Sequence, residues 1–141
     1  MSMQLVVFRL CREEYAILID KVREIINYLP VTRLPGTPAY FEGVINVRGK
    51  IVPVIDFAAK MGLSAVEDMN KQIVIVETGN KEVGLTVDTV TEVIQTVPDN
   101  FASMETSDTD NQNIRKAYKF HDRTIILLDI EQVMSGPALA G

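Results

Sequence analysis

The chain has 141 residues, of which 47% are hydrophobic and 23% charged, a composition that allows one globular domain with a substantial apolar core. Its formal net charge is -5 and no cluster of lysine and arginine is present, which argues against a nucleic-acid partner. The single cysteine, Cys11, cannot form an intrachain disulfide, and no apolar run approaches the roughly 20 residues that span a bilayer. We therefore expect a soluble, intracellular protein without direct membrane insertion.

The first predicted elements are a strand, a charged turn and a second strand. Residues 5–10 and 15–19 are rich in branched and aromatic apolar side chains, and residues 12–14 between them are charged. Asp20 is interpreted as an N-cap, because its carboxylate can accept from the free N–H groups of a following turn. Three prolines at positions 30, 35 and 38 predict an irregular connection, and residues 39–42 a single helical turn.

Residues 43–56 predict a β-hairpin, because two β-branched apolar segments flank a short polar turn. Gly49 supplies the backbone freedom of a tight reversal, so Arg48 is expected at a rigid tip facing water. A fixed guanidinium can bind a carboxylate through two parallel hydrogen bonds, which makes Arg48 a candidate docking residue. The alternative is an ordinary surface arginine. Pro53 cannot donate to a ladder and predicts a free edge or a bulge.

The second half of the chain predicts elements of the same kind. Residues 72–77 and 83–87 are interpreted as strands around a turn at 79–81, and residues 115–120 and 124–130 as a hairpin around 121–123. Residues 105–113 contain no side chain that needs burial and predict a mobile surface loop, while residues 135–141 predict a flexible tail.

The two halves repeat one another. At an offset of 68, residues 6–30 align with residues 74–98, and Glu14, Asp20, Val22, Glu24, Ile26 and Pro30 meet identical residues. At an offset of 73, residues 50–56 align with residues 123–129. We interpret residues 1–141 as a single domain built from two similar units, about 5–62 and 72–134, which leaves room for the units to exchange strands. Short strands with closely spaced turns, present twice, predict a mainly β fold of two small antiparallel barrels.

Sequence signatures of enzymes are missing. The chain lacks the glycine-rich nucleotide loops, the zinc-protease motif, paired cysteines and the serine-hydrolase motif. His121 is the only histidine and is interpreted as a turn residue. Carboxylates close three apolar runs at Asp56, Asp88 and Asp129, where they could hold a cation. The repeat pairs Asp20 with Asp88 and Asp56 with Asp129, which favours capping, and we predict no catalytic site, metal or cofactor.

Four segments together resemble the CheW family of chemotaxis coupling proteins: residues 22–25, 32–35, 41–56 and 127–129. The resemblance spans residues 5–134, and its core, Asn46 to Asp56, is long and specific. It implies two five-stranded SH3-like barrels around a shared hydrophobic core, with short helical turns and no catalytic activity. Ala16, where the family usually has glycine, is a departure that concerns loop geometry.

The resemblance also implies partners and binding residues. Family members bridge the cytoplasmic tips of methyl-accepting chemoreceptors to the regulatory domain of the histidine kinase CheA, in membrane-associated arrays, and other copies of the family protein are further candidate partners. Arg48 corresponds to a receptor-contact arginine and Glu24 to its acidic partner. The implied receptor-binding residues are Val22, Glu24, Thr32, Gly43, Asn46 and Arg48, and the implied kinase-binding residue is Gly49. For Val22 and Gly43, core packing and a turn are the alternatives.

Two other functions stay open at this point. The same fold could serve a different kinase pathway, such as motility or development. A small acidic β-barrel enzyme using Asp56, Asp88 or Asp129 with a divalent ion is the other alternative, and a metal-dependent thermal shift would reveal it.

Overall fold

The computed structural model describes residues 2–62, 71–97, 101–103, 115–120 and 122–135. The predicted loop at 105–113, the turn residue His121 and the tail beyond residue 135 lie outside these ranges. In the first half, the elements are β1 (Met3–Leu10), β2 (Glu13–Leu18), η1 (Ile19–Lys21), β3 (Val22–Asn27), β4 (Phe41–Val47), β5 (Lys50–Asp56) and α1 (Phe57–Lys60). In the second half they are β6 (Gln72–Thr78), β7 (Lys81–Val87), β8 (Thr89–Thr96), β9 (Phe101–Ser103), β10 (Arg115–Phe120), β11 (Arg123–Leu128) and α2 (Ile130–Ser135).

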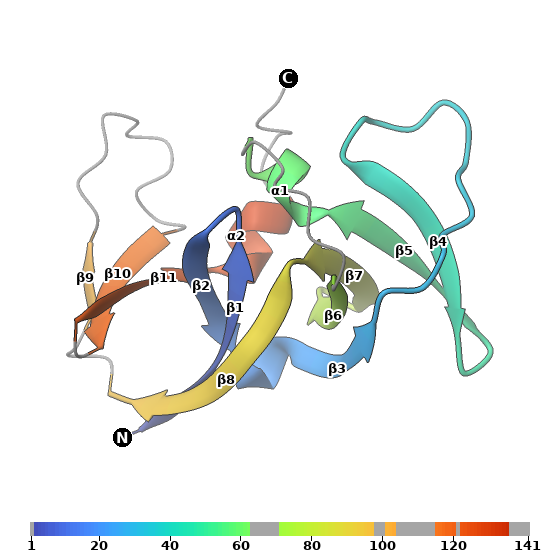
Figure 1. The fold of residues 1–141 in the computed structure, drawn as a ribbon. Helices are drawn as coiled ribbons and strands as arrows, with labels where there is room; N and C mark the ends of the chain where they lie inside the picture. Colours follow the sequence, from blue (N-terminus) through green and yellow to red (C-terminus); the bar gives the residue numbers. More distant parts are fainter. Residues whose placement is uncertain (1, 63–70, 98–100, 104–114, 121, 136–141) are drawn as a thin grey trace.

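These strands form two sheets that lie side by side, with the short helices α1 and α2 between them (Figure 1). Sheet A has the order β8-β1-β2-β11-β10-β9, and sheet B has the order β3-β6-β7-β5-β4. The expectation of a mainly β fold in two similar parts is confirmed. Sheet B has five strands, and sheet A has five strands plus the three-residue β9 at its edge.

Each sheet contains strands from both halves of the chain. Sheet A takes β1 and β2 from the first half, and sheet B takes β6 and β7 from the second half at the corresponding places. The ladders match residue for residue at the offset of 68: Val6 pairs with Ile17 where Val74 pairs with Leu85. The strands β3 and β8 cross over, so that β3 pairs with β6 and β8 pairs with β1. The duplication is therefore visible in the pairing registers as well as in the sequence.

Alternating side chains of the central strands fill three clusters. In β1, Val6 and Phe8 enter the largest cluster, which also receives Val74 and Val76 from β6 and therefore lies between the sheets. The opposite face of β1 packs a cluster within sheet A, and the opposite face of β6 packs one within sheet B. Side chains of successive strand residues point to opposite faces, so both faces of these strands are apolar and buried.

Several local predictions are wrong. Residues 22–27 form the strand β3 rather than a segment capped by Asp20, because η1 begins at Ile19 and places Asp20 inside a three-residue turn. Residues 39–42 are not helical: a turn closed by a hydrogen bond from Phe41 N to Pro38 O leads directly into β4. The prediction of a free edge at Pro53 holds locally: Pro53 lies within β5 and pairs with β4, but the pairing with β7 begins one residue later, at Val54.

Candidate protein-interaction site

The turn between β4 and β5 presents Arg48 to solvent. Val47 pairs with Lys50, so Arg48 and Gly49 form a two-residue turn with φ values of 52° and 84°. Two positive φ values identify the turn type that matches the twist of a hairpin. Asn46 Oδ1 accepts a hydrogen bond of 3.0 Å from Gly49 N, which braces the turn from inside. The Arg48 side chain is 80% exposed at this rigid tip, as the sequence predicted.

Glu24, on β3, forms an ion pair with Arg48. The distance from Arg48 Nη2 to Glu24 Oε2 is 3.2 Å, and the Glu24 side chain is 27% exposed. The strand β3 is an edge of sheet B and β4 is the opposite edge, so this contact joins the two edges across the end of the sheet. Because one guanidinium nitrogen makes the contact, much of the fork remains open to a second carboxylate.

Gly43 and Thr32 form a second local unit, on β4 and the connection that precedes it. Thr32 N donates to Val44 O at 2.9 Å and Val44 N donates to Thr32 O at 3.0 Å. A Cβ atom on Gly43 would lie 2.3 Å from Thr32 O, and Gly43 has a φ of +151°. Gly43 is buried and Thr32 is exposed, so Gly43 sets the backbone position of Thr32.

Val22 occupies a different environment. It starts β3, opposite Val76, and packs half-buried against the cluster between the sheets. The structure thus brings together Arg48 with Glu24, Asn46 with Gly49, and Thr32 with Gly43, while Val22 faces the core two residues before Glu24. Tyr28, just after β3, donates to Glu42 Oε2 at 2.9 Å and ties the end of β3 to β4. Burial, followed by this hydrogen bond, raises the pKa of Tyr28 to about 12.

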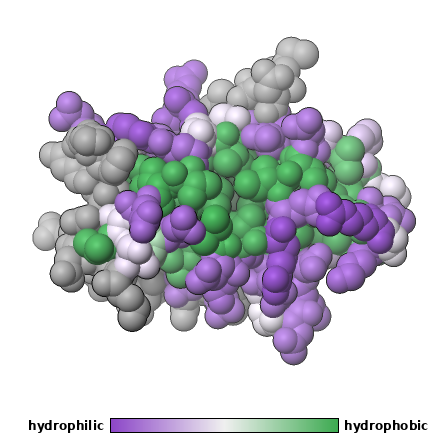
Figure 2. Space-filling view, turned by 90° about the horizontal axis from the view of Figure 1, so that it is seen from below, coloured by the Kyte–Doolittle hydropathy of each residue, from purple (hydrophilic) through white to green (hydrophobic). Residues whose placement is uncertain are grey.

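Sequence reasoning missed a set of exposed apolar side chains on and just after β3 and β8. Ile25 is 38% exposed and Val93 51% exposed, and these two residues are equivalent in the repeat. Leu29 and Val97, also exposed and equivalent, follow the ends of the same strands. Figure 2 views the molecule from the side on which β3 and β8 lie in Figure 1 and shows a continuous hydrophobic band. The signal that could have identified these side chains is that apolar residues recur at positions 68 residues apart, outside the predicted strands.

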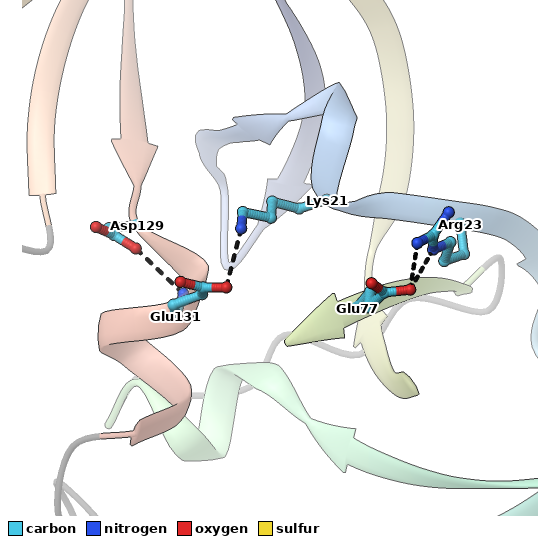
Figure 3. A network of polar contacts seen from close by, with 5 residues as sticks. All are labelled: Lys21, Arg23, Glu77, Asp129 and Glu131. Carbon is cyan, nitrogen blue, oxygen red and sulfur yellow. Dashed lines mark hydrogen bonds and ion pairs between the residues drawn. The ribbon is translucent and has the colours of Figure 1, made fainter. Parts of the chain in front are cut away.

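Ion pairs also hold β3 and the turn η1 that precedes it (Figure 3). Arg23 Nε donates to Glu77 Oε2 on β6 at 2.7 Å, and Lys21 Nζ donates to Glu131 Oε1 on α2 at 2.9 Å. The hydrogen bond with Glu131 raises the pKa of Lys21. Asp129 Oδ1 accepts from Glu131 N at 3.2 Å at the start of α2. These exposed pairs add little stability individually, but they link the strand that carries Glu24 to its neighbours.

Sheet A contains an acid–base cluster that no prediction anticipated. Arg123, at the start of β11, donates to both oxygens of Glu14 on β2, at 3.0 and 2.5 Å, and also to Glu92 on β8. The hydrogen bond from Arg123 lowers the pKa of Glu14, and the two glutamates raise the pKa of Arg123. The cluster therefore joins three strands of sheet A.

The three aspartates considered as a cation site make separate structural contacts. Asp56 caps α1 by accepting from Ala59 N at 3.2 Å, and Asp88 accepts from Cys11 N at 3.0 Å. Asp129 bonds to Glu131 as described above. Within the ranges that the structure describes, no three metal-ligating side chains are grouped, and no helix there is long and apolar enough to cross a bilayer.

Comparison with known proteins identifies the family. The model of the CheW-like domain matches residues 4–138. The probable chemotaxis protein CheW of Rhizobium etli is 35% identical over 94% of this chain and 87% of its own length, and chemotaxis protein CheW of Klebsiella aerogenes is 34% identical over 97% and 84%. The crystal structure of the scaffolding protein TtCheW from Thermoanaerobacter tengcongensis superposes with a TM-score of 0.87 at 31% identity, covering 99% of this chain and 94% of that one. The chain belongs to the CheW-like family, whose members are non-catalytic scaffold proteins of chemotaxis.

Proposed function

We propose that this protein couples the cytoplasmic tips of methyl-accepting chemoreceptors to the regulatory domain of the histidine kinase CheA in membrane-associated arrays. The observation that carries the proposal is the combination of a rigid, exposed Arg48, paired with Glu24, and an exposed apolar band along β3 and β8. An adaptor needs surfaces of this kind because it holds partners through contacts rather than chemistry.

The receptor surface would comprise Arg48, Glu24, Asn46 and Thr32. Val22 and Gly43 would support this surface through packing. A receptor helix with a carboxylate could bind the open side of the Arg48 fork and lay an apolar face against Ile25 and Val93. The apolar contact would supply affinity, and the charge pair would set the register of the helix.

The kinase surface would begin at Gly49, on the other side of the same turn. Ile51, two residues further along the chain in β5, is 64% exposed and lines an open groove of sheet B. A second partner contacting Gly49 and Ile51 could bind while the receptor occupies the Arg48 side. Each contact could be weak, because an array that repeats them gains strength through multivalency.

Replacing Arg48 with aspartate tests the receptor surface. Charge reversal puts a second carboxylate beside that of Glu24 and removes the guanidinium fork, so we expect Arg48→Asp to weaken binding of a receptor cytoplasmic fragment by roughly 2 kcal/mol or more, about 30-fold or more. The circular dichroism spectrum should not change, since Arg48 is 80% exposed and aspartate tolerates a positive φ. Titration calorimetry with the receptor fragment measures the effect.

Arg12→Asp is a matched control, because Arg12 is an exposed arginine in another two-residue turn and has a φ of 72°. We expect it to bind the receptor fragment normally. Normal binding by Arg48→Asp, or equal loss in both variants, would contradict the assignment of Arg48.

A further inference from the structure

The cluster of Arg123, Glu14 and Glu92 in sheet A has a counterpart in sheet B, because of the duplication. The ion pairs in the two clusters are arranged differently. At the repeat offsets, Glu14 corresponds to Glu82, Glu92 to Glu24, and Arg123 to Lys50. In sheet A, Arg123 hydrogen-bonds to both of its glutamates, and its side chain is 36% exposed. The cluster is closed, and both carboxylates are bound by a residue at the start of β11.

The equivalent cluster in sheet B is open. Lys50 Nζ lies 3.7 Å from Glu82 Oε2, and the Lys50 side chain is 73% exposed. The other carboxylate, Glu24, contacts Arg48, which lies two residues before Lys50 in the turn. The two glutamates thus pair with two cations from the same turn and strand, whereas their counterparts share one cation.

The difference follows from the cations at the equivalent positions. A guanidinium is a planar fork with five donors that can serve two carboxylates at once, whereas a lysine ammonium acts as a compact point charge. We expect an arginine at position 50 to reach both Glu82 and Glu24, the counterparts of the two glutamates that Arg123 contacts. The ladders around the two clusters share the same register: β5 pairs with β7 as β11 pairs with β2, and Glu24 pairs with Ile75 as Glu92 pairs with Val7. Glu24 would then be occupied by residue 50 and withdrawn from Arg48.

We infer that Lys50 is a positioning residue: by engaging Glu82 alone, it leaves Glu24 to orient Arg48 at the turn. The part of this inference that concerns partner binding rests on the proposed function, while the pairing of Glu24 does not. The residue type at position 50 thereby decides whether the cluster is a closed internal contact or the base of an exposed docking fork.

The test is Lys50→Arg in the full-length chain, read out first without any partner. In the parent protein, Arg48→Ala should shift the NMR resonance of the Glu24 side-chain carboxyl carbon, because the ion pair is lost. In the Lys50→Arg background, Arg48→Ala should leave that resonance unchanged, because Glu24 has a new partner. A shift of equal size in both backgrounds would overturn the inference.

Binding of a receptor cytoplasmic fragment is the second readout. Lys50→Arg should weaken it roughly two- to tenfold, the usual effect of releasing one ordered side chain at an interface. Lys81→Arg is the matched control, since Lys81 is an exposed lysine of the neighbouring β7 and lies beside Glu82; it should change neither readout. If Arg48→Ala leaves receptor binding intact, the proposed receptor surface fails while the carboxyl resonance still decides the role of Lys50. If Arg48→Ala weakens binding and Lys50→Arg does not, the positioning role is refuted.

Discussion

At the scale of single residues, the geometry of the candidate interaction site depends on backbone conformations as much as on side chains. Arg48 has a positive φ that a non-glycine residue seldom adopts, and the hairpin imposes it because both positions of the turn require it. Gly43 has a φ of +151° and lies against the backbone of Thr32. The resemblance associates both residues with binding, and the structure gives them different environments: Arg48 is exposed, and Gly43 is buried.

Gly43→Ala should destabilise the protein by about 2 kcal/mol or more, because the new Cβ would overlap Thr32 O and the backbone angle is unfavourable for alanine. Urea unfolding followed by circular dichroism measures the change. Gly36→Ala is the control: Gly36 also has a positive φ, 78°, but nothing lies within 4 Å of its added Cβ, and we expect a cost of about 1 kcal/mol. An equal loss of unfolding free energy in the two variants would show that the backbone at Thr32 moves to accommodate the new Cβ at no cost.

At the scale of elements, the β4–β5 and β1–β2 hairpins differ in whether a glycine marks their turn in the sequence. The β4–β5 turn contains Gly49 and was placed correctly. The β1–β2 turn consists of Cys11 and Arg12, with φ values of 55° and 72°, and contains no glycine. The sequence predicted this turn at residues 12–14, so the predicted turn begins one residue too late. Asp88 accepts from Cys11 N and helps to hold this unfavourable turn, a contact 77 residues distant in sequence.

Arg12→Gly should stabilise the protein by up to about 1 kcal/mol, because glycine adopts the positive φ of this turn without the Cβ penalty. The change would appear as a higher urea midpoint with an unchanged slope. Arg12→Ala removes the same charge but keeps the penalty, so it should not stabilise. A gain of similar size in both variants would attribute the effect to charge rather than to backbone conformation.

The strands β3 and β8 were missed for a related reason. Exposed positions alternate with partly or fully buried ones along these strands, but isoleucine and valine also stand on exposed positions, so neither strand shows the apolar alternation that identifies a half-buried strand. Each strand is the edge of the sheet that it joins by crossing over. Apolar side chains left exposed on two equivalent edges are understandable if a partner covers them, in agreement with the proposed receptor surface.

At the scale of the whole molecule, the crossing of β3 and β8 makes the two halves depend on one another. Each half of the chain contains two hairpins, but the strand that completes each three-stranded unit around β1 or β6 comes from the other half. The cluster between the sheets also takes residues from both halves. The sequence repeat units therefore differ from the spatial units.

We expect fragments 1–62 and 71–141 to be unfolded when produced separately and to fold when mixed. Alone, each has hairpins without their third strand and half of the central cluster, and isolated hairpins are marginally stable. Dispersion of amide proton resonances for each fragment and for the equimolar mixture would show this. A well-dispersed spectrum from either fragment alone would mean that one repeat unit suffices for folding.

The sequence by itself determined the mainly β fold, the duplication and the exposed turn carrying Arg48, because these depend on local alternation, identity at a fixed offset and turn chemistry. Only the tertiary structure decided which half supplies each strand of a sheet, since register and crossover arise from packing between residues distant in sequence. It also decided the partner of each glutamate. Glu24 and Glu92 occupy the same position in the repeat, yet the first meets Arg48 and the second Arg123, because ion pairs form between side chains that only the folded sheets bring within reach.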